Sequence, residues 1–335
     1  MKISELGQFR LIDLVNEMVN KSRNEESASW QNLIIGIGDD TAAWRCDDTT
    51  QLAKVDCQVQ NVHFSFDYVT WEELGWKALA VNLSDIAAMG GFPRYALVSL
   101  GLPPDTEVDD VIDLYRGMLK LAKSSGTAVI GGNMSGSAVV FVDVTVIGST
   151  GDKNGSMLLR SSVKPGDKVA VTGYVGAAAA GLEMLRKKMR FDAETTNILR
   201  IGFARPVPRL AEGRLLIESG VKAAIDISDG LLADLGHICE SSRVGADVYI
   251  ENVPVHPKVR ESFGDKALEL ALSGGEDYEL LFTASREIIE KVKQSARCPV
   301  TVIGEIVAAP GKITLVDGKG NRFSPGKTGW DHFKV

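Results

Sequence analysis

The chain has 335 residues, which at roughly 150 residues per domain predicts two domains of ordinary size. Hydrophobic residues make up 44% and charged residues 24%, a balance typical of folded proteins with large cores and not of disordered chains. The formal net charge of −7 gives no electrostatic footprint for nucleic acid or for acidic membranes, so any bound phosphate must be held by a local arrangement of residues.

Cysteine usage and the N-terminal sequence both favour a cytoplasmic protein. The four cysteines are scattered without a CxxC pair, which predicts neither a zinc site nor a secreted disulfide framework. The opening residues MKISELGQFR lack the apolar core of a signal peptide, and Asp13 and Glu17 argue against a transit peptide. Glycines interrupt the longest charge-free stretch, 124–142, so we expect no transmembrane segment.

Segments of helical period alternate with β-rich runs, which predicts mixed α and β structure. In the first half we expect helices over 9–19, 70–89 and 107–124, and strands over 33–37, 51–56, 95–102 and 138–148. The second of these helices opens with a capping box, in which Thr70 is the cap and Glu73 follows three residues later.

A turn at Pro165 and Gly166 introduces the second half, and the domains are expected to cover 1–152 and 153–335. The strands expected here are 168–173, 223–228, 246–250, 279–284, 299–306 and 312–316, and the helices are 176–185, 207–220 and 230–242.

Acidic residues end several apolar segments or lie in glycine-flanked turns. They are Asp39, Asp40, Asp56, Asp85, Asp226, Asp229, Glu276 and Asp277. Any one of them would more often be a turn or cap residue, as Asp229 before Gly230 could be. Burying the whole set costs many kcal/mol unless cations compensate the charge, and oxygen ligands select Mg²⁺ or Mn²⁺. The set therefore indicates a site with several divalent ions.

The glycine-rich segment AVIGGNMSGS, 128–137, offers backbone N–H groups that could cradle a phosphate, although a purely structural turn is equally consistent with it. Familiar nucleotide signatures are absent. The string SPGKTG has Asn321 where a P-loop needs its first glycine, and GIGDDT has Thr41 where a dinucleotide fingerprint needs its third.

Five strings in this chain resemble the thiamine-monophosphate kinase family. They are GIGDD, KALAVNLSDIAAMG, LLRSSVKPGDKVAVTG, IDISDGLLADLGHI and ALSGGEDYELLFT, and the similarity runs in order from about Glu5 to Phe333. The family belongs to the superfamily of aminoimidazole-ribonucleotide synthetase and selenophosphate synthetase. The resemblance implies a two-domain PurM-like α/β (α+β) fold, an N-terminal domain that forms a dimeric β-barrel core, and a C-terminal α/β domain that completes the cleft for nucleotide and substrate.

The resemblance also implies a reaction, the phosphorylation of thiamine phosphate to thiamine diphosphate by ATP with several Mg²⁺ ions. The metal ligands it implies are Asp40, Asp56, Asp85, Asp226 and Asp229; the nucleotide contacts are Tyr115, Gly132, Asn133, Arg160 and Ser228; the thiamine phosphate contacts are His63, Glu276 and Trp330. We expect Asp85 to act at the reacting phosphates through metal ions. No general base is assigned, because the incoming phosphate oxygen is already ionised.

Plainer roles stay open for two of these residues. Trp330 could be a C-terminal side chain packed on the core, and His63, between Val62 and Phe64, could be a core histidine.

The chain departs from the family pattern at two places. Lys54-Val55 stands where the family usually has hydroxyl residues before Asp56, and Asn133 replaces a ligand carboxylate. An amide can bind a hard cation but brings no charge, so one magnesium site is expected to be weaker. Lys54 could supply a fixed positive charge or point away. The alternatives are a paralogue with another phosphorylated substrate and a non-catalytic nucleotide-binding homologue.

Overall fold

The computed structural model describes residues 1–335 except 7, 25, 38–42, 47, 324–328 and 331–335. The chain divides into two compact units. Unit 1 contains Met1–Ile86 and Gly91–Ser156, and unit 2 contains Ala87–Gly90 and Met157–Val335. None of the described helices combines the length and apolarity that a membrane crossing needs.

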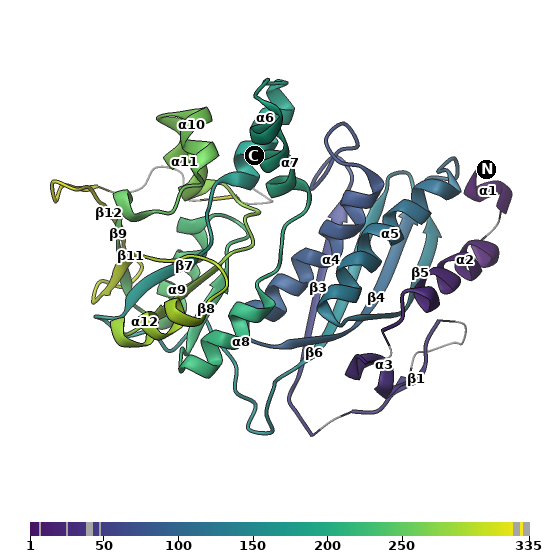
Figure 1. Cartoon of the computed structure of the whole chain (residues 1–335), viewed down its shortest axis with the longest axis horizontal. Helices are drawn as coiled ribbons and strands as arrows, with labels where there is room; N and C mark the ends of the chain where they lie inside the picture. Colours follow the sequence, from purple (N-terminus) through teal and green to yellow (C-terminus); the bar gives the residue numbers. More distant parts are fainter. Residues whose placement is uncertain (7, 25, 38–42, 47, 324–328, 331–335) are drawn as a thin grey trace. The chain divides into compact units, whose positions relative to one another are not determined.

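Unit 1 is built around a four-stranded sheet (Figure 1). Its helices are α1 (Ile3–Leu6), α2 (Gln8–Lys21), α3 (Ala28–Asn32), α4 (Trp71–Ala88, whose last two residues belong to unit 2) and α5 (Val108–Ser125). Its strands are β1 (Leu33–Ile35), β2 (Ala43–Trp44), β3 (Gln51–Val59), β4 (Phe92–Leu102), β5 (Ala128–Gly136) and β6 (Phe141–Ser149). Strands β1 and β2 pair with each other, and the larger sheet has the order β3-β6-β4-β5, with β4 and β5 parallel and the other pairs antiparallel.

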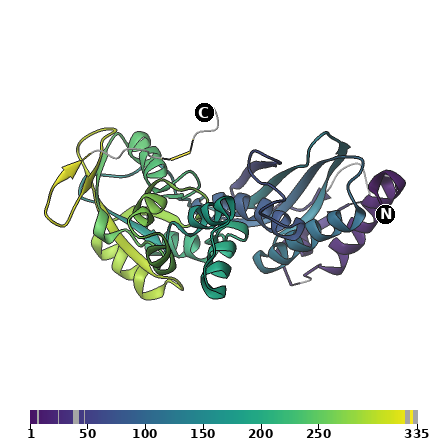
Figure 2. The ribbon, with the colours of Figure 1, turned by 90° about the horizontal axis from the view of Figure 1, so that it is seen from above.

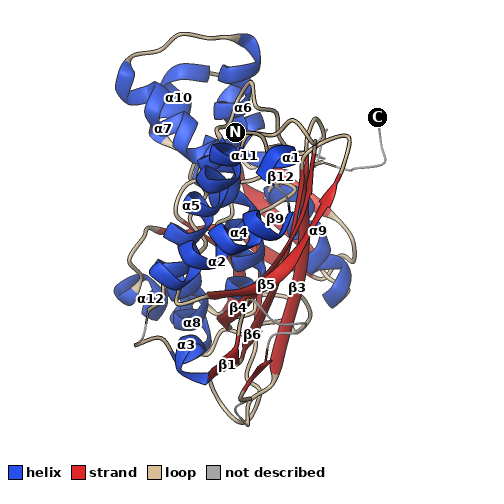
Figure 3. Ribbon diagram, turned by 90° about the vertical axis from the view of Figure 1, so that its right-hand side faces the viewer, coloured by secondary structure: helices blue, strands red, loops and turns tan. Residues whose placement is uncertain are grey.

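One face of the larger sheet is covered by helices. Figure 3 shows α2, α4 and α5 on the same side of the strands, and Figure 2 shows this arrangement from above. On β6, Val142, Val144 and Val146 face these helices and are fully buried, while the residues between them are half-buried. The described strands form an open sheet with β3 and β5 at its edges, so within one chain the expected barrel is not closed.

Helices α4 and α5 pack closely because each carries a glycine at the crossing. A Cβ atom on Gly75 would lie 1.8 Å from the carbonyl oxygen of Leu114, and one on Gly117 would lie 1.8 Å from that of Glu72. The predicted capping box is confirmed at the start of α4, where the Thr70 N–H donates to Glu73 Oε2 (2.8 Å) and the Glu73 N–H donates to Thr70 Oγ1 (3.2 Å).

Of the two interpretations left open for the glycine-rich segment 128–137, the structural turn does not form. Strand β5 continues through the glycines to Gly136 and stays paired with β4 along this length. Ala96 pairs with Val129 and Leu97 pairs with Gly131, so Ile130 is the extra residue of a bulge. The glycines therefore permit close strand pairing instead of ending the strand.

Unit 2 contains a seven-stranded sheet. Its strands are β7 (Lys168–Thr172), β8 (Ala223–Asp226), β9 (Gly245–Tyr249), β10 (Leu280–Ala284), β11 (Val300–Val307), β12 (Ile313–Val316) and β13 (Arg322–Phe323), in the order β13-β12-β9-β11-β7-β10-β8. Its helices are α6 (Ala177–Lys187), α7 (Ala193–Ala204), α8 (Leu210–Ser219), α9 (Leu231–Ser242), α10 (Pro257–Phe263), α11 (Lys266–Ser273) and α12 (Arg286–Ser295), with a short 3₁₀ turn at Ile250–Asn252. All strand pairs are antiparallel except β9 with β12.

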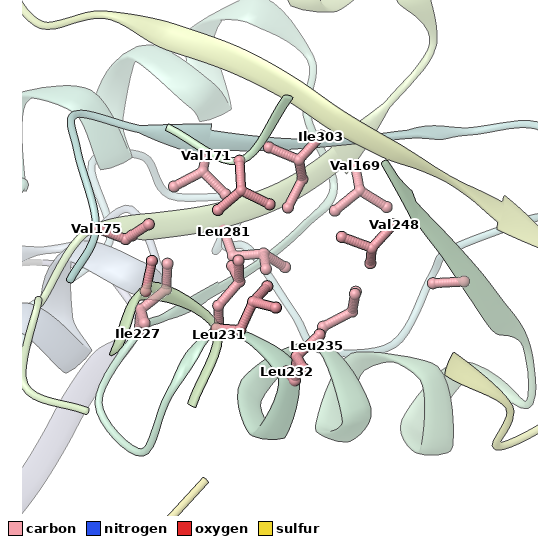
Figure 4. Close-up of a cluster of buried hydrophobic side chains, with 14 of the residues drawn as sticks. Val169, Val171, Val175, Ile227, Leu231, Leu232, Leu235, Val248, Leu281 and Ile303 are labelled. Carbon is pink, nitrogen blue, oxygen red and sulfur yellow. The ribbon is translucent and has the colours of Figure 1, made fainter. Parts of the chain in front are cut away.

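The first turns of α9 are anchored in the main core of unit 2. Leu231, Leu232 and Leu235 lie against valine, leucine and isoleucine side chains of the sheet, including Val169 and Leu281 (Figure 4). All five side chains are at most 1% exposed. This packing fixes the end of β8 and the turn between β8 and α9, which together carry the predicted site residues Asp226, Ser228 and Asp229.

Candidate functional site

In unit 1 two predicted metal ligands meet at a lysine. Strand β3 places Lys54 and Asp56 on one face, and α4 brings Asp85 to the same face. Lys54 Nζ lies 3.2 Å from Asp85 Oδ2 and 3.4 Å from Asp56 Oδ2. Burial of Lys54 opposes its charge, but the two carboxylates outweigh this effect and raise the pKa of Lys54 above its ordinary value. Lys54 is therefore a charged member of this group.

The carboxylates of Asp56 and Asp85 remain accessible to a bound ion. Asp85 is 25% exposed and Asp56 is 43% exposed, so both carboxylates are accessible at the surface of unit 1. Their oxygen donors suit Mg²⁺ or Mn²⁺. Asp40, the third metal ligand predicted in this half of the chain, lies outside the described residues.

Three predicted nucleotide contacts line a single pocket in unit 1. Tyr115 of α5 and Gly132 and Asn133 of β5 surround a space of about 60 Å³. Apolar side chains complete its wall, among them Val15 and Val98. Burial raises the pKa of the Tyr115 phenol, so Tyr115 is a neutral, largely apolar wall residue.

Gly132 leaves no room for a side chain. A Cβ atom there would lie 1.8 Å from the carbonyl oxygen of Val98, its partner on β4. We expect Gly132→Ala to lower the free energy of unfolding by about 2 kcal/mol or more and to weaken ATP binding, because a backbone atom cannot move aside easily. Gly136→Ala on the same strand is the matched control, since among the described residues, apart from its chain neighbours, no heavy atom lies within 4 Å of a Cβ placed there. Thermal unfolding and nucleotide titration of both variants measure these effects, and equal behaviour of the two would contradict the prediction.

His63 lies in the turn that follows β3. Its Nδ1 accepts a hydrogen bond of 3.0 Å from the Val59 N–H, which means that a neutral ring carries its proton on Nε2. The imidazole is half-buried, so it shapes this turn and also reaches the surface.

In unit 2 the turn between β8 and α9 is held by one carboxylate. Asp234 Oδ2 accepts hydrogen bonds from the N–H groups of Ser228, Asp229 and Gly230 at 3.0, 3.2 and 3.1 Å. Burial, together with the nearby carboxylates of Asp226 and Asp229, raises the pKa of Asp234 to about 8. Asp226 is itself buried, so negative charge is concentrated at this turn.

Asp229, Asp234 and His237 form a candidate metal centre. One potential ligand atom from each lies within 4.8 Å of the other two. Two carboxylates and an imidazole can hold Mn²⁺, and the carboxylates alone suit Mg²⁺. Of the three, only Asp229 was predicted from the sequence. Asp234 and His237 were missed, although their spacing of three residues places them on the same face of a helix.

The SGGEDYE segment pairs with this turn. The Glu276 N–H donates to the Ser228 carbonyl oxygen (2.8 Å), and the Tyr278 N–H donates to that of Ile227 (2.9 Å). Glu276 has φ 70° and Tyr278 has φ 50°, a left-handed conformation that is unfavourable for such side chains and often marks a functional site. Ser228 and Glu276 therefore lie in one rigid group of loops.

Trp330 joins the same loops through its backbone. Its N–H donates to the Asp229 carbonyl oxygen at 3.0 Å, and its side chain is 57% exposed. A core packing role is thus excluded, and the indole is accessible beside Asp229.

Hydrogen bonds to the buried carboxylates of Glu279 and Asp277 hold the SGGEDYE segment in place. Glu279, 6% exposed, accepts hydrogen bonds from Arg209 Nε (2.6 Å) and Thr172 Oγ1 (2.7 Å). Asp277 accepts from the N–H groups of Gly176 (2.7 Å) and Ala178 (3.2 Å) at the start of α6, and burial raises its pKa to about 7.

Arg160 lies apart from this group within unit 2. The Arg160 carbonyl oxygen accepts a hydrogen bond of 3.1 Å from Ser242 Oγ, and Ser242 is the last residue of α9. Asp229 lies at the other end of this helix, just before its first turn. The 12 residues of this helix span about 18 Å. The Arg160 side chain is exposed.

Comparison with known proteins connects both units to one family. Residues 38–150 match the N-terminal domain, and residues 164–317 the C-terminal domain, of AIR synthase related protein. Thiamine-monophosphate kinase of Bacillus subtilis (strain 168) is 36% identical over 333 residues, covering 96% of this chain and 99% of the relative.

Solved structures show the same similarity. The thiamine-monophosphate kinase of Stenotrophomonas maltophilia K279a has a TM-score of 0.80 and 34% identity, covering 91% of this chain and 95% of that one. The structure of AaThiL complexed with AMPPCP and TMP has a TM-score of 0.76 and 32% identity, covering 99% of both chains.

Proposed function

This chain belongs to the thiamine-monophosphate kinase family, and we propose that it catalyses ATP-dependent phosphorylation of thiamine phosphate by direct in-line transfer. The products are thiamine diphosphate and ADP, so the enzyme is a phosphotransferase with a phosphate group as acceptor. The observation that carries this proposal is the likeness over 99% of both chains to a structure that holds AMPPCP and TMP together.

We assign the metal ligands to both units. Asp229, Asp234 and His237 offer one donor set, with Asp226 as an additional charge. Asp56 and Asp85 are each proposed to bind an ion through the oxygen that Lys54 does not contact, and Asp40 is proposed as a further ligand. Bound Mg²⁺ ions would neutralise the negative charge of the phosphates, so that two anionic groups can approach each other. The domains proposed for these roles are 1–152 and 153–335.

The nucleotide contacts follow the pocket of unit 1. Tyr115, Gly132 and Asn133 form its wall, and Ser228 and Arg160 are proposed as further contacts from unit 2. The amide of Asn133 can donate to a phosphate oxygen, a bond that a carboxylate cannot provide.

Thiamine phosphate combines a cationic thiazolium ring with an anionic phosphate. The exposed indole of Trp330 can stack on the ring, and the Glu276 carboxylate can balance its positive charge. His63 is proposed to contact the substrate through Nε2, because Nδ1 is engaged with the backbone. The acceptor oxygen is ionised near neutral pH, so positioning and charge neutralisation replace a general base.

We further propose a cytoplasmic homodimer in which two sheets close into a β-barrel. The support is the sheet face opposite α4 and α5, where Val55 is 56% exposed. Large apolar side chains on an open sheet face favour coverage by another chain.

The direct test is an assay of ATP and thiamine phosphate over a range of Mg²⁺ and Mn²⁺ concentrations, with thiamine diphosphate quantified by chromatography. Equal amounts of thiamine diphosphate and ADP are expected. Folded protein that forms no thiamine diphosphate under any condition would reject the proposal. Binding of AMPPCP by such protein would then favour a non-catalytic homologue, and turnover of another phosphorylated compound would favour a paralogue.

A further inference from the structure

Lys54 lies where a divalent ion bridging Asp56 and Asp85 would need to bind. Its ammonium group contacts Oδ2 of both carboxylates, at 3.4 and 3.2 Å. We propose that Lys54 is a built-in cation at this position, so that the enzyme with bound nucleotide holds one divalent ion fewer than it would with a neutral residue at 54. This inference rests on the function proposed above.

The local fold directs Lys54 to this place. Residues 54 and 56 share one face of β3, and Val55 points to the opposite, exposed face. The register of β3 against β6 is continuous, with Lys54 opposite Val146 and Asp56 opposite Val144, so there is no bulge that would turn Lys54 away. Helix α4 then supplies Asp85 on that same face.

The charges explain why the ammonium and a bridging ion exclude each other. The two carboxylates together carry a charge of −2, and Lys54 reduces the net charge of the group to −1. A divalent ion that bridged the same two oxygens would have to displace the ammonium or lie beside it, and like charges at such short distance repel strongly. A neutral hydroxyl side chain at 54 would impose neither cost.

An ammonium also differs chemically from a divalent ion. It has three N–H donors, of which two can serve Asp56 and Asp85 and the third is directed elsewhere. Part of the charge neutralisation is then covalently attached to the protein and does not depend on the Mg²⁺ concentration.

The test counts bound ions independently of turnover. Mn²⁺ binding is measured by electron paramagnetic resonance on the full chain with saturating AMPPCP and thiamine phosphate. Lys54→Thr, and the unbranched neutral variant Lys54→Met, are each expected to bind one Mn²⁺ more per chain than the wild type. Lys54→Arg, which keeps the charge, should retain the wild-type number. Lys153→Thr is the matched control, because it removes an exposed lysine paired with Asp48 at 3.2 Å in the same unit.

Each outcome decides the inference. An unchanged ion count in folded Lys54→Thr and Lys54→Met would overturn it, as would an extra ion in Lys153→Thr. Thermal unfolding of every variant verifies the fold, and either neutral variant is sufficient if the other does not fold. Wild-type turnover separates the two claims. If the wild type forms thiamine diphosphate but the neutral variants bind no extra ion, only the role of Lys54 is overturned. If the neutral variants bind an extra ion but the wild type forms no thiamine diphosphate, only the proposed function is overturned.

Discussion

Asp85→Asn is expected to lower the turnover number about 100-fold or more. Asp85 projects from α4 beside Lys54 and Asp56, on the face where we place the reacting phosphates. Asparagine has the same shape but no charge, so the variant removes electrostatic stabilisation without leaving a cavity. A 100-fold loss corresponds to about 2.7 kcal/mol in activation free energy, a normal cost for losing one charged group at a transition state.

The matched control is Asp113→Asn. Asp113 lies on α5, also in unit 1, and forms an exposed ion pair with Arg116. Its amide variant should keep wild-type turnover. Steady-state assays over a range of Mg²⁺ concentrations measure both variants, and near-normal activity of Asp85→Asn would remove Asp85 from the catalytic group.

Arg209→Met should lower the free energy of unfolding by about 3–5 kcal/mol. Glu279 is 6% exposed, and Arg209 contacts both of its carboxylate oxygens. Removing one partner of a buried ion pair leaves the other charge uncompensated, which costs far more than the pair itself contributes. Since Glu279 ends the SGGEDYE segment, we also expect weaker binding of thiamine phosphate.

Two further variants isolate this effect. Arg116→Met makes the same substitution in the exposed pair with Asp113, where a change below about 1 kcal/mol is expected. Arg209→Met combined with Glu279→Gln should recover much of the lost stability, because the buried charge is gone. Urea unfolding provides the numbers. A single-variant loss below 1 kcal/mol, or no recovery in the double variant, would contradict the assignment.

The sequence predicted the regular elements where local signals were strong. The capping box of Thr70 and Glu73 located the start of α4, and hydrophobic periodicity located α5 and β6. Helix α7 was missed, although Asp192, whose side chain accepts from the Thr195 N–H at 2.9 Å, is an N-cap signal that could have found it.

Glycine was the least reliable guide to structure. The glycine pair at 131–132 was compatible with a turn. In the structure, glycine is required there because two neighbouring strands lie in close contact. Gly132 lies opposite Val98 in a parallel pairing that a one-dimensional pattern does not encode.

The parts of the site that the sequence did not reveal depend on contacts that exist only in the folded chain. Asp229 was predicted from its strand-end position, but Asp234 and His237 were read only as part of a helix. Their donor atoms lie near Asp229 because the Asp234 side chain reaches from the first turn of α9 to the loop and accepts from the Asp229 N–H, and His237 follows one turn later on the same face of the helix. Which direction Lys54 takes was left open, and the register of β3 with β6 together with the position of Asp85 decides it.

The stereochemical course at phosphorus tests the central claim most directly. ATP made chiral at the γ-phosphorus with oxygen isotopes is incubated with thiamine phosphate, and the configuration of the transferred group in thiamine diphosphate is determined. Direct in-line transfer predicts inversion. Retention would show two successive displacements through a phosphorylated enzyme, and would contradict an account in which the protein only positions and neutralises the two phosphates.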